Sequence, residues 1–552
     1  LHKEYRRQRQ MCIRDRSMTI HLAEETQTNP ILNISVFIAF IVITMYIVTK
    51  ASKKPQKSAT DFYTGGASFT GTQNGLAIAG DFLSAASFLG IVGAIAMTGY
   101  DGFLYSIGFF VAWLIALLLV AEPLRNTGKF TMADVLSFRL KQRPVRVAAA
   151  FATLFVSLFY LVAQMAGAGA LVSVLLDLHD KSAQAIVVVV VGIVMMAYVL
   201  IGGMKGTTYV QMIKAVLLVA GVFIMFLIIA IMWKGNFSQL LADAVANHGD
   251  PDILKPGQKY GKTDASKLDF ISLGLALALG AAGLPHVLMR FYTVPTAKEA
   301  RKSVTWAIVL IGSFYLLTLF LGFAAAALVG PETLANAPGG ANAAAPLLAA
   351  KLAGPIFMAL ISAVAFATVL AVVAGLAITA SASVAHDFYN GVLRNGEATE
   401  EEQVRVSRIT VVVISIASII LGILAMDQNV AFLVSLAFCI GASANLPTLL
   451  YSLYWKRFNT TGAVASLWTG LIVALVLIAF SPAVSGAETA MFPNVDFSWF
   501  PLTNPGLISI AAGFLAGIID TFLGKDDEIP ELQSEMEVRS LTGVGVEAPV
   551  DH

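Results

Sequence analysis

Long apolar runs constrain this chain more than any other feature of its sequence. Stretches with almost no charge recur along most of its 552 residues, and about 18 such residues in a row are enough for a helix to cross a bilayer. Hydrophobic residues make up 57% of the chain and charged residues 13%, whereas a soluble domain carries about 25% charged residues. The sequence therefore predicts an all-α polytopic membrane protein rather than a soluble domain with one anchor.

The apolar runs divide into thirteen predicted transmembrane helices. These spans cover residues 32–49, 70–98, 103–122, 147–176, 184–201, 209–233, 269–289, 304–329, 347–385, 407–426, 429–453, 461–481 and 505–524. Lys and Arg are shared unequally between alternate connections, with 20 in the set that begins at 50–60 and 6 in the set that begins at 99–102. Cytoplasmic loops carry the excess of Lys and Arg. The first set is therefore predicted to be cytoplasmic, which puts the N-terminus outside the cell and the C-terminus inside.

The two ends of the chain differ from the apolar part between them. Residues 1–17 hold six Lys and Arg and no apolar run long enough for a signal sequence, so we expect them to be a non-native head. Residues 18–31 are then the extracellular N-terminus, and 32–524 form the membrane domain. Residues 525–552 are acidic and are expected to be a mobile cytoplasmic tail.

Enzyme and channel signatures are missing from the sequence. The two long outside connections, 234–267 and 330–346, are predicted to be loops from their Pro, Gly and Asn content, and neither contains a catalytic constellation. Metalloprotease, nucleophile-elbow and phosphate-loop motifs do not occur in a supporting context. Cys12 and Cys439 are too few and too differently placed for a disulfide framework. A channel filter is not recognisable either.

A carboxylate, Asp81, lies inside the second span, in the stretch GLAIAGDFLSAASFLG. An ionised side chain at the centre of a bilayer costs at least about 2.5 to 3.5 kcal/mol, so it should face a polar cavity or a partner. One hypothesis is that the helix unwinds here and that freed carbonyls, such as those of Ala79 and Phe82, bind a cation. The alternative is that Asp81 caps the next half-helix by accepting from the N–H of Leu83 or Ser84. Both hypotheses require a broken helix.

A second break is predicted in the seventh span, where LALALGAAGLPHVLMRF contains Gly280, Gly283 and Pro285. Proline removes a backbone donor and clashes with the preceding turn. The two interrupted spans are five helices apart, as expected for two inverted repeats, about 70–233 and 269–453, that each begin with a discontinuous helix. Half-helix N-termini favour an anion and unwound carbonyls favour a cation. This is the architecture of a secondary transporter.

Further polar residues are expected near these breaks. Tyr160 and Gln164 are four residues apart and so lie on one face of the fourth span. His286 follows Pro285 and has an unperturbed pKa close to physiological pH, which suits a proton carrier. The alternatives are an interhelical hydrogen bond for Tyr160 and a structural role for His286. Hydroxyls in the span 347–385, including Thr368, usually bond back to their own helix.

Several stretches together carry a resemblance to a known family: GLAIAGDFLSAASFLG, YLVAQMAGAGALV, YVLIGGMKGTTYVQMIKAVLL, GLPHVLMRFYTV and EVRSLTGVGVE. They resemble the sodium:solute symporter family, and within it the acetate permease and monocarboxylate transporter branch, from about residue 33 to 548. The resemblance implies a LeuT-type fold of thirteen helices with a five-plus-five inverted-repeat core in a bacterial cytoplasmic membrane. It implies cation-coupled uptake of short monocarboxylates such as acetate, propionate or pyruvate, no enzymatic activity, no nucleic acid partner, and no cofactor beyond the coupling ion.

The helix breaks and the polar positions described above supply the candidates for substrate binding. The expected substrate-binding residues are Tyr160, Gln164, Gly283, Pro285 and His286.

The cation-site segment of the first broken helix is matched by Ala79, Asp81 and Phe82. Sodium-coupled members place adjacent Ser or Thr hydroxyls sixteen residues before the Asp of an acidic-Φ-Tyr end. Here that distance leads from HDFY back to Ala371 and Val372, whose side chains cannot coordinate a cation.

A second departure occurs in GGMKGTTYVQMIK. The family pattern has an Asp where this chain has Gln211, and the Gln that follows in the family is Lys214. Two positions associated with sodium are therefore changed.

Both Na+ and H+ remain candidate coupling ions. A sodium site needs about five or six oxygens, and Ala79, Phe82 and Thr368 can contribute some of them. Proton coupling needs only one group of shifted pKa, for which Asp81 and His286 are the candidates.

Two alternative functions stay open at this point. One is a transporter-like solute sensor, although the 28 residues after Gly524 are too few for a kinase module. The other is a proton-driven symporter of a different small solute.

Overall fold

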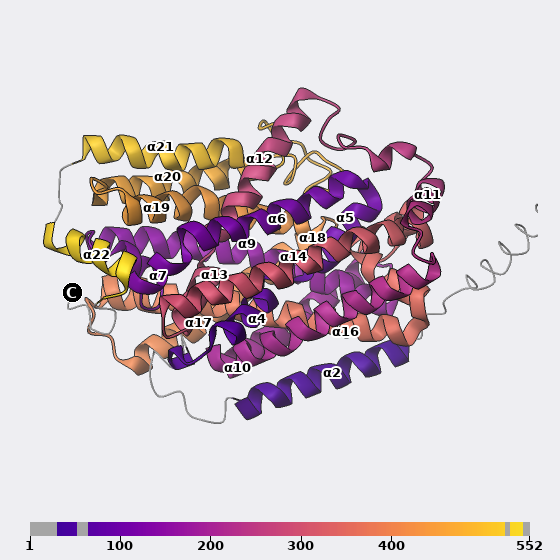
Figure 1. The fold of residues 1–552 in the computed structure, drawn as a ribbon, viewed down its shortest axis with the longest axis horizontal. Coiled ribbons are helices and arrows are strands. Elements are labelled where there is room, and N and C mark those ends of the chain that lie inside the picture. Colours follow the sequence, from indigo (N-terminus) through magenta and orange to yellow (C-terminus); the bar gives the residue numbers. More distant parts are fainter. Residues whose placement is uncertain (1–29, 52–64, 525–529, 545–552) are drawn as a thin grey trace, which may run out of the picture.

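Apolar helices run side by side through the molecule, and most of them end at one of two opposite ends (Figure 1). The computed structural model describes residues 30–51, 65–524 and 530–544. The expected head, 1–17, and nearly all of 18–31 lie outside the described residues. Within the described residues the secondary structure is helical apart from a single bridge between Ser485 and Phe492. The predicted all-α fold class is confirmed.

Eleven helical segments of the described chain are long and apolar enough to cross a membrane, or twelve if a bent pair counts as one span. They lie in α6 (Tyr100–Leu119), α9 (Gln142–Leu176), α10 (Lys181–Met232), α12 (Asp264–Gly280), α14 (Ala297–Leu328), α16 (Ala344–Ala382), α17 (Glu400–Leu424), α18 (Val430–Ile440) with α19 (Leu446–Tyr454), α20 (Thr460–Ala479) and α21 (Gly506–Leu523). The helix α10 holds two of them, Lys181–Leu200 and Thr208–Met232. The first predicted span, 32–49, falls in α2 (Pro30–Ala51), a helix that is not in this set.

The first broken helix is the bent pair. Helix α4 (Gly71–Phe82) ends at Leu83, whose φ of −72° and ψ of 77° leave the helical region. The chain resumes as a π-helical turn and α5 (Ile91–Thr98), and the two halves meet at 59°. The Ser84 hydroxyl accepts from the N–H of Ala86 at 3.2 Å and so caps the second half. The predicted interruption of this span is confirmed.

The second broken helix is interrupted at Leu284. Helix α12 runs into a tight turn, Ala281–Gly283, and Leu284 is extended with ψ 115° before α13 (Pro285–Met289) begins. Proline pushes the preceding residue out of the helical region and suits the first position of a new helix. A Cβ on Gly283 would lie 2.3 Å from the carbonyl oxygen of Gly441. Only glycine therefore allows the broken segment to pack this closely against the helix opposite.

Some connections and one span differ from the sequence predictions. The connection 234–267 contains a regular helix, α11 (Phe237–His248), because Asn236 caps its N-terminus by accepting from the N–H of Gln239 at 3.1 Å. The connection 330–346 contains the short helix α15 (Pro331–Asn336). The span 347–385 is not continuous, since Gly354, with φ 83°, interrupts α16 one residue before a proline.

The tail is partly folded, which corrects the expectation of a mobile end. Residues 530–542 form α22 (Pro530–Thr542), which packs against α7 (Ala121–Thr127) (Figure 1). Arg539 is 6% exposed, and its Nε donates to the carbonyl of Asn126 at 2.9 Å. The side-chain amide of Asn126 donates in return to the carbonyl of Ser540 at 3.0 Å. These long-range contacts were not visible in the local acidic composition.

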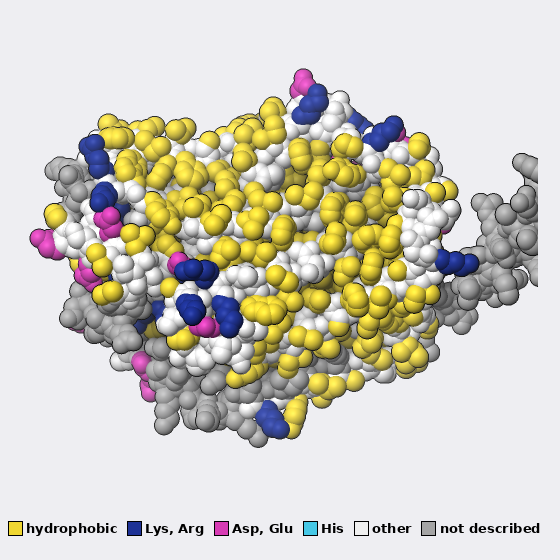
Figure 2. Space-filling model, in the orientation of Figure 1, with side chains coloured by type: hydrophobic (Ala, Val, Ile, Leu, Met, Phe, Trp, Pro, Cys, Tyr) yellow, Lys and Arg dark blue, Asp and Glu magenta, His cyan; other side chains and the backbone are white. Residues whose placement is uncertain are grey.

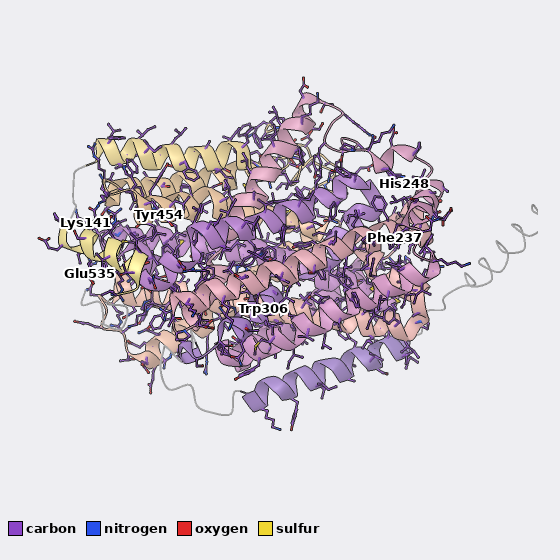
Figure 3. All side chains as sticks on the ribbon, viewed as in Figure 1. Lys141, Phe237, His248, Trp306, Tyr454 and Glu535 are labelled. Atoms are coloured by element: carbon purple, nitrogen blue, oxygen red, sulfur yellow. The ribbon has the colours of Figure 1, made fainter. Side chains whose placement is uncertain are left out.

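The surface has the polarity expected of a bilayer-spanning protein. Hydrophobic side chains cover most of the face in Figure 2, while the charged ones gather toward the ends of the bundle. Lys141, Tyr454 and Glu535 lie at one end and Phe237 and His248 at the other (Figure 3). The first end carries the connections that are rich in Lys and Arg, so it is the predicted cytoplasmic end.

Candidate functional site

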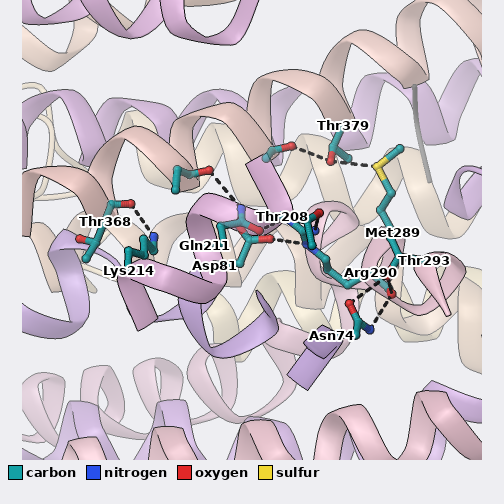
Figure 4. A network of polar contacts seen from close by, with 12 residues as sticks. Asn74, Asp81, Thr208, Gln211, Lys214, Met289, Arg290, Thr293, Thr368 and Thr379 are labelled. Atoms are coloured by element: carbon teal, nitrogen blue, oxygen red, sulfur yellow. Dashed lines mark hydrogen bonds and ion pairs between the residues drawn. The ribbon is translucent and has the colours of Figure 1, made fainter. Parts of the chain in front are cut away.

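Asp81 is buried at the end of α4 and has charged and polar partners (Figure 4). Its Oδ2 lies 2.8 Å from the Arg290 Nε, and its Oδ1 accepts from the Gln211 side-chain amide at 2.7 Å. The N–H of Leu83 donates to Ala79, and the N–H of Ser84 donates to Phe82. The capping alternative for Asp81 is therefore wrong, and the expectation of a partner is correct.

Arg290 joins the two broken helices to α10. It follows α13, its side chain is 1% exposed, and its Nη1 donates to the Thr208 hydroxyl at 2.8 Å. Its Nη2 donates to the side-chain oxygen of Gln211. A buried guanidinium is tolerated when its charge and its N–H groups are matched in this way. Arg290 was missed in the sequence because it directly follows the seventh predicted span, 269–289, and was counted with the cations of the next connection. The signal was available, since a buried carboxylate such as Asp81 needs a countercharge.

The side chains of Asn74 and Thr293 fix the backbone of Arg290, from which the guanidinium extends. The Arg290 carbonyl accepts from the Asn74 side-chain amide at 3.0 Å and from the Thr293 hydroxyl at 2.7 Å. The Thr293 hydroxyl also bonds the Asn74 oxygen at 2.9 Å. Helix α4 is thus attached to the turn after α13 at both its first and its last turns.

Lys214 is the second buried cation of this region. It is 1% exposed, and its Nζ donates to the backbone carbonyl of Thr368 at 2.7 Å (Figure 4). The Thr368 hydroxyl bonds back to the carbonyl of Ala365 at 2.6 Å, which is the usual behaviour of a hydroxyl in a membrane helix. The Gln211 amide reaches the carbonyl of Ala371 at 3.2 Å. Gln211 and Lys214, the two residues of GGMKGTTYVQMIK that depart from the family pattern, therefore both contact α16.

Three of the predicted substrate residues share a buried region. Tyr160, Gln164 and His286 are at most 2% exposed, and the rings of Tyr160 and His286 lie 5.1 Å apart between centroids. Neither side-chain polar atom of Gln164 and neither ring nitrogen of His286 has a hydrogen-bond partner among the residues that the structure describes. Leaving a buried polar group unsatisfied costs about 1 to 3 kcal/mol, and each such group in a native structure calls for an explanation. A polar ligand bound beside Gln164 and His286 would provide the missing hydrogen bonds and so explain these groups.

Aromatic side chains surround the first helix break. The ring of Phe82 lies 5.0 Å from that of Trp113 and 5.9 Å from that of Phe438. The ring of Tyr160 lies 6.3 Å from that of Phe438. The remaining two predicted substrate residues, Gly283 and Pro285, lie at the second break, where the carbonyl of Gly283 accepts from Asn445 at 2.8 Å. Phe82, Trp113, Phe438 and Tyr160 thus form one connected group of aromatic rings beside the break.

A separate charged cluster lies toward the predicted cytoplasmic end. The Nη1 of Arg146 lies 3.0 Å from a carboxylate oxygen of Asp134 and 2.8 Å from one of Asp387. Burial alone raises the pKa of Asp134, yet the neighbouring His386 and Arg146 and the N–H of Phe130 bring that pKa below its usual value. Asp134, His386 and Asp387 are close enough to hold a metal ion. However, the guanidinium already supplies the positive charge between the two carboxylates.

An all-helical bundle in which two broken helices meet beside buried charges defines a membrane transporter of the secondary type. The chain belongs to the sodium:solute symporter family, whose family model matches residues 62–470. It is a multi-pass membrane protein.

Curated relatives cover almost the whole chain. It is 70% identical over 549 residues to the Monocarboxylic acid transporter of Corynebacterium glutamicum, covering 97% of this chain and all of that protein. It is 48% identical over 521 residues to the uncharacterized symporter YwcA of Bacillus subtilis, covering 94% of this chain and all of that protein.

Solved structures share the fold. A Na+-coupled sialic acid symporter in a substrate-bound outward-open state superposes with a TM-score of 0.67 at 18% identity, covering 90% of this chain and 98% of that one. Mhp1, a nucleobase-cation-symport-1 family transporter, superposes with a TM-score of 0.52 at 9% identity, covering 88% and 100%. At such identities these likenesses concern the fold alone. The family predicted from the sequence is confirmed by the family model and by the curated relatives.

Proposed function

We propose that this protein is a secondary active symporter that carries short-chain monocarboxylates, such as acetate, propionate and pyruvate, into the cell together with a cation. The observation that carries the proposal is the set of unpartnered polar atoms on Gln164 and His286, buried close to the two helix breaks. The high identity to a protein named Monocarboxylic acid transporter supports the substrate class.

The chemistry of the site suits a small amphipathic anion. A short monocarboxylate has one anionic head, which accepts hydrogen bonds, and an apolar end of one or two carbons. The Gln164 amide and a His286 N–H are donors for the head. The rings of Phe82, Trp113 and Phe438 form an apolar surface for the tail. Binding sites for small molecules commonly combine a mostly apolar lining with a few placed polar groups.

Movement of the two broken helices together is part of the proposal. They are treated as corresponding members of the two inverted repeats, 70–233 and 269–453, whose rocking alternates access to the site. The ion pair between Asp81 and Arg290 supports this view, because it connects the end of α4 to the turn after α13. Displacing one broken helix then displaces the other.

The proposed setting is a bacterial cytoplasmic membrane with the C-terminus inside, as the distribution of Lys and Arg indicates. The coupling ion is Na+ or H+, and no other cofactor is needed.

Uptake of radiolabelled acetate into liposomes that contain the purified full-length protein tests the proposal. An imposed Na+ gradient or pH gradient is expected to drive accumulation above equilibrium, with propionate and pyruvate as competitors. Uptake that is indifferent to both gradients would rule out symport. A solute sensor, the alternative function, would bind acetate and gain thermal stability from it without carrying it across the membrane.

A further inference from the structure

The oxygens expected to hold Na+ are already engaged within the protein. The Ala79 carbonyl accepts from the N–H of Leu83 at 2.8 Å, and the Phe82 carbonyl accepts from the N–H of Ser84 at 2.8 Å and the Ser87 hydroxyl at 3.1 Å. The Thr368 hydroxyl donates to its own helix, and the Thr368 carbonyl accepts from Lys214. A sodium cage needs about five or six oxygens. The four named oxygens are too few for such a cage, and each already takes part in a hydrogen bond within the protein.

Lys214 places a basic side chain of the protein beside the Thr368 carbonyl, one of the oxygens named above. Its Nζ lies 2.7 Å from the carbonyl oxygen of Thr368, a distance typical of a charged donor and an oxygen acceptor. The side chain extends from α10 to α16, two helices packed along each other. Residues 362–382 of α16 contain no Asp, Glu, Lys, Arg, His, Cys or Tyr. The ammonium therefore meets only backbone and neutral side chains on that helix.

The charges around Lys214 oppose a further cation. Asp81 and Arg290 lie within electrostatic reach of its ammonium, and the other ionisable groups near Asp81 are Tyr160, Tyr198 and His286. The network thus holds one carboxylate, Asp81, and two basic side chains, Arg290 and Lys214, among its described members. At about 4 Å, two like charges repel by about 4 kcal/mol even at an effective dielectric constant of 20. A sodium ion entering here would have no free carboxylate to balance it.

We infer that Lys214 is a resident cation that takes the place of Na+ between α4, α10 and α16, so that this protein transports its substrate without Na+ at that position. The statement about transport rests on the proposed function. The statement about cation binding depends only on the geometry around Lys214. Since symport needs a coupling ion, a pH gradient then drives uptake.

Binding of radioactive Na+ to the purified full-length protein tests this directly. Wild type is expected to show no saturable Na+ binding. Lys214→Gln, which introduces the residue of the family pattern, is expected to gain saturable Na+ binding, with a dissociation constant at least about tenfold below the highest Na+ concentration at which wild type shows none, because the basic group is removed. Lys351→Gln, on α16 but outside the network, is the matched control and is expected to behave as wild type. If Lys214→Gln fails to give a monodisperse protein, Lys214→Ser is measured in its place.

Transport supplies the second measurement. Acetate accumulation by wild type is expected in Na+-free buffer under a pH gradient, with less than a twofold change when a Na+ gradient is added. Saturable Na+ binding to wild type, uptake that requires a Na+ gradient, or folded variants that bind Na+ no better than wild type would each overturn the inference. If no gradient drives acetate uptake, the proposed function fails, while the Na+ binding measurement still decides the role of Lys214.

Discussion

Breaking the buried ion pair between Asp81 and Arg290 should lower the free energy of unfolding by several times more than breaking an exposed pair. In Asp81→Asn the shape of the side chain is kept but its charge is lost, and the Arg290 guanidinium, 1% exposed, stays buried. Removing one partner of a buried pair costs about 3 to 5 kcal/mol. The remaining amide oxygen still accepts one hydrogen bond, and Thr208 and Gln211 still accept from the guanidinium. We therefore expect a loss near the lower limit, about 3 kcal/mol.

The measurement is the unfolding free energy in mixed detergent micelles, followed by tryptophan fluorescence. Asp264→Asn is the matched control, because Asp264 forms an ion pair of 3.0 Å with Lys267 at 95% and 59% side-chain exposure. An exposed pair contributes about 0 to 1 kcal/mol. Combining Asp81→Asn with Arg290→Gln should cost at least about 1.5 kcal/mol less than the sum of the single changes. Equal losses in the two Asn variants, or additive losses in the double variant, would refute the role given to this pair.

Three further changes test other parts of the structure. Gln164→Leu should stabilise the substrate-free protein by about 1 kcal/mol, because it removes an unsatisfied amide. The acetate concentration that gives half of the maximal thermal shift should rise at least about tenfold, and an unchanged concentration would exclude Gln164 from the site. Gly283→Ala should cost about 2 kcal/mol or more and abolish uptake, since its Cβ would meet a backbone oxygen at 2.3 Å, whereas Gly274→Ala, in α12 before the break, has open space and should be tolerated. The lowered pKa of Asp134 means that its ionised form stabilises the fold above about pH 4 and that this contribution is lost as the pH falls further. The unfolding temperature of wild type should therefore drop more steeply than that of Asp134→Asn below pH 4, and parallel curves would contradict this.

Features with a local physical cause were predictable from the sequence. The apolar spans follow from composition, and the second break follows from Gly283 and Pro285, whose effects on the backbone need no knowledge of neighbours. The first break was expected at Asp81 but lies at Leu83, because Asp81 stays in the last turn of α4. The burial of Tyr160, Gln164 and His286 followed from their position inside such spans.

Features that depend on distant contacts were not predictable in the same way. Arg290 follows its span like a loop cation, and only its contact with Asp81, 209 positions away, identifies it as part of the site. Lys214 was noticed as an unusual residue, but its bond to Thr368 required the packing of α10 against α16. Helix α22 is polar in sequence, and its docking depends on Asn126, more than 400 positions earlier.

The reciprocal bonds between α22 and Asn126 have an evolutionary consequence. The backbone and the side chain of Asn126 serve two neighbouring positions of α22, and the guanidinium of Arg539 also lies 5.6 Å from the ring of Phe138. A substitution on one side therefore leaves buried polar groups unmatched on the other. Positions 126, 138 and 539 should covary among relatives, and lineages that shorten the tail should lose the Asn and the aromatic ring together with it.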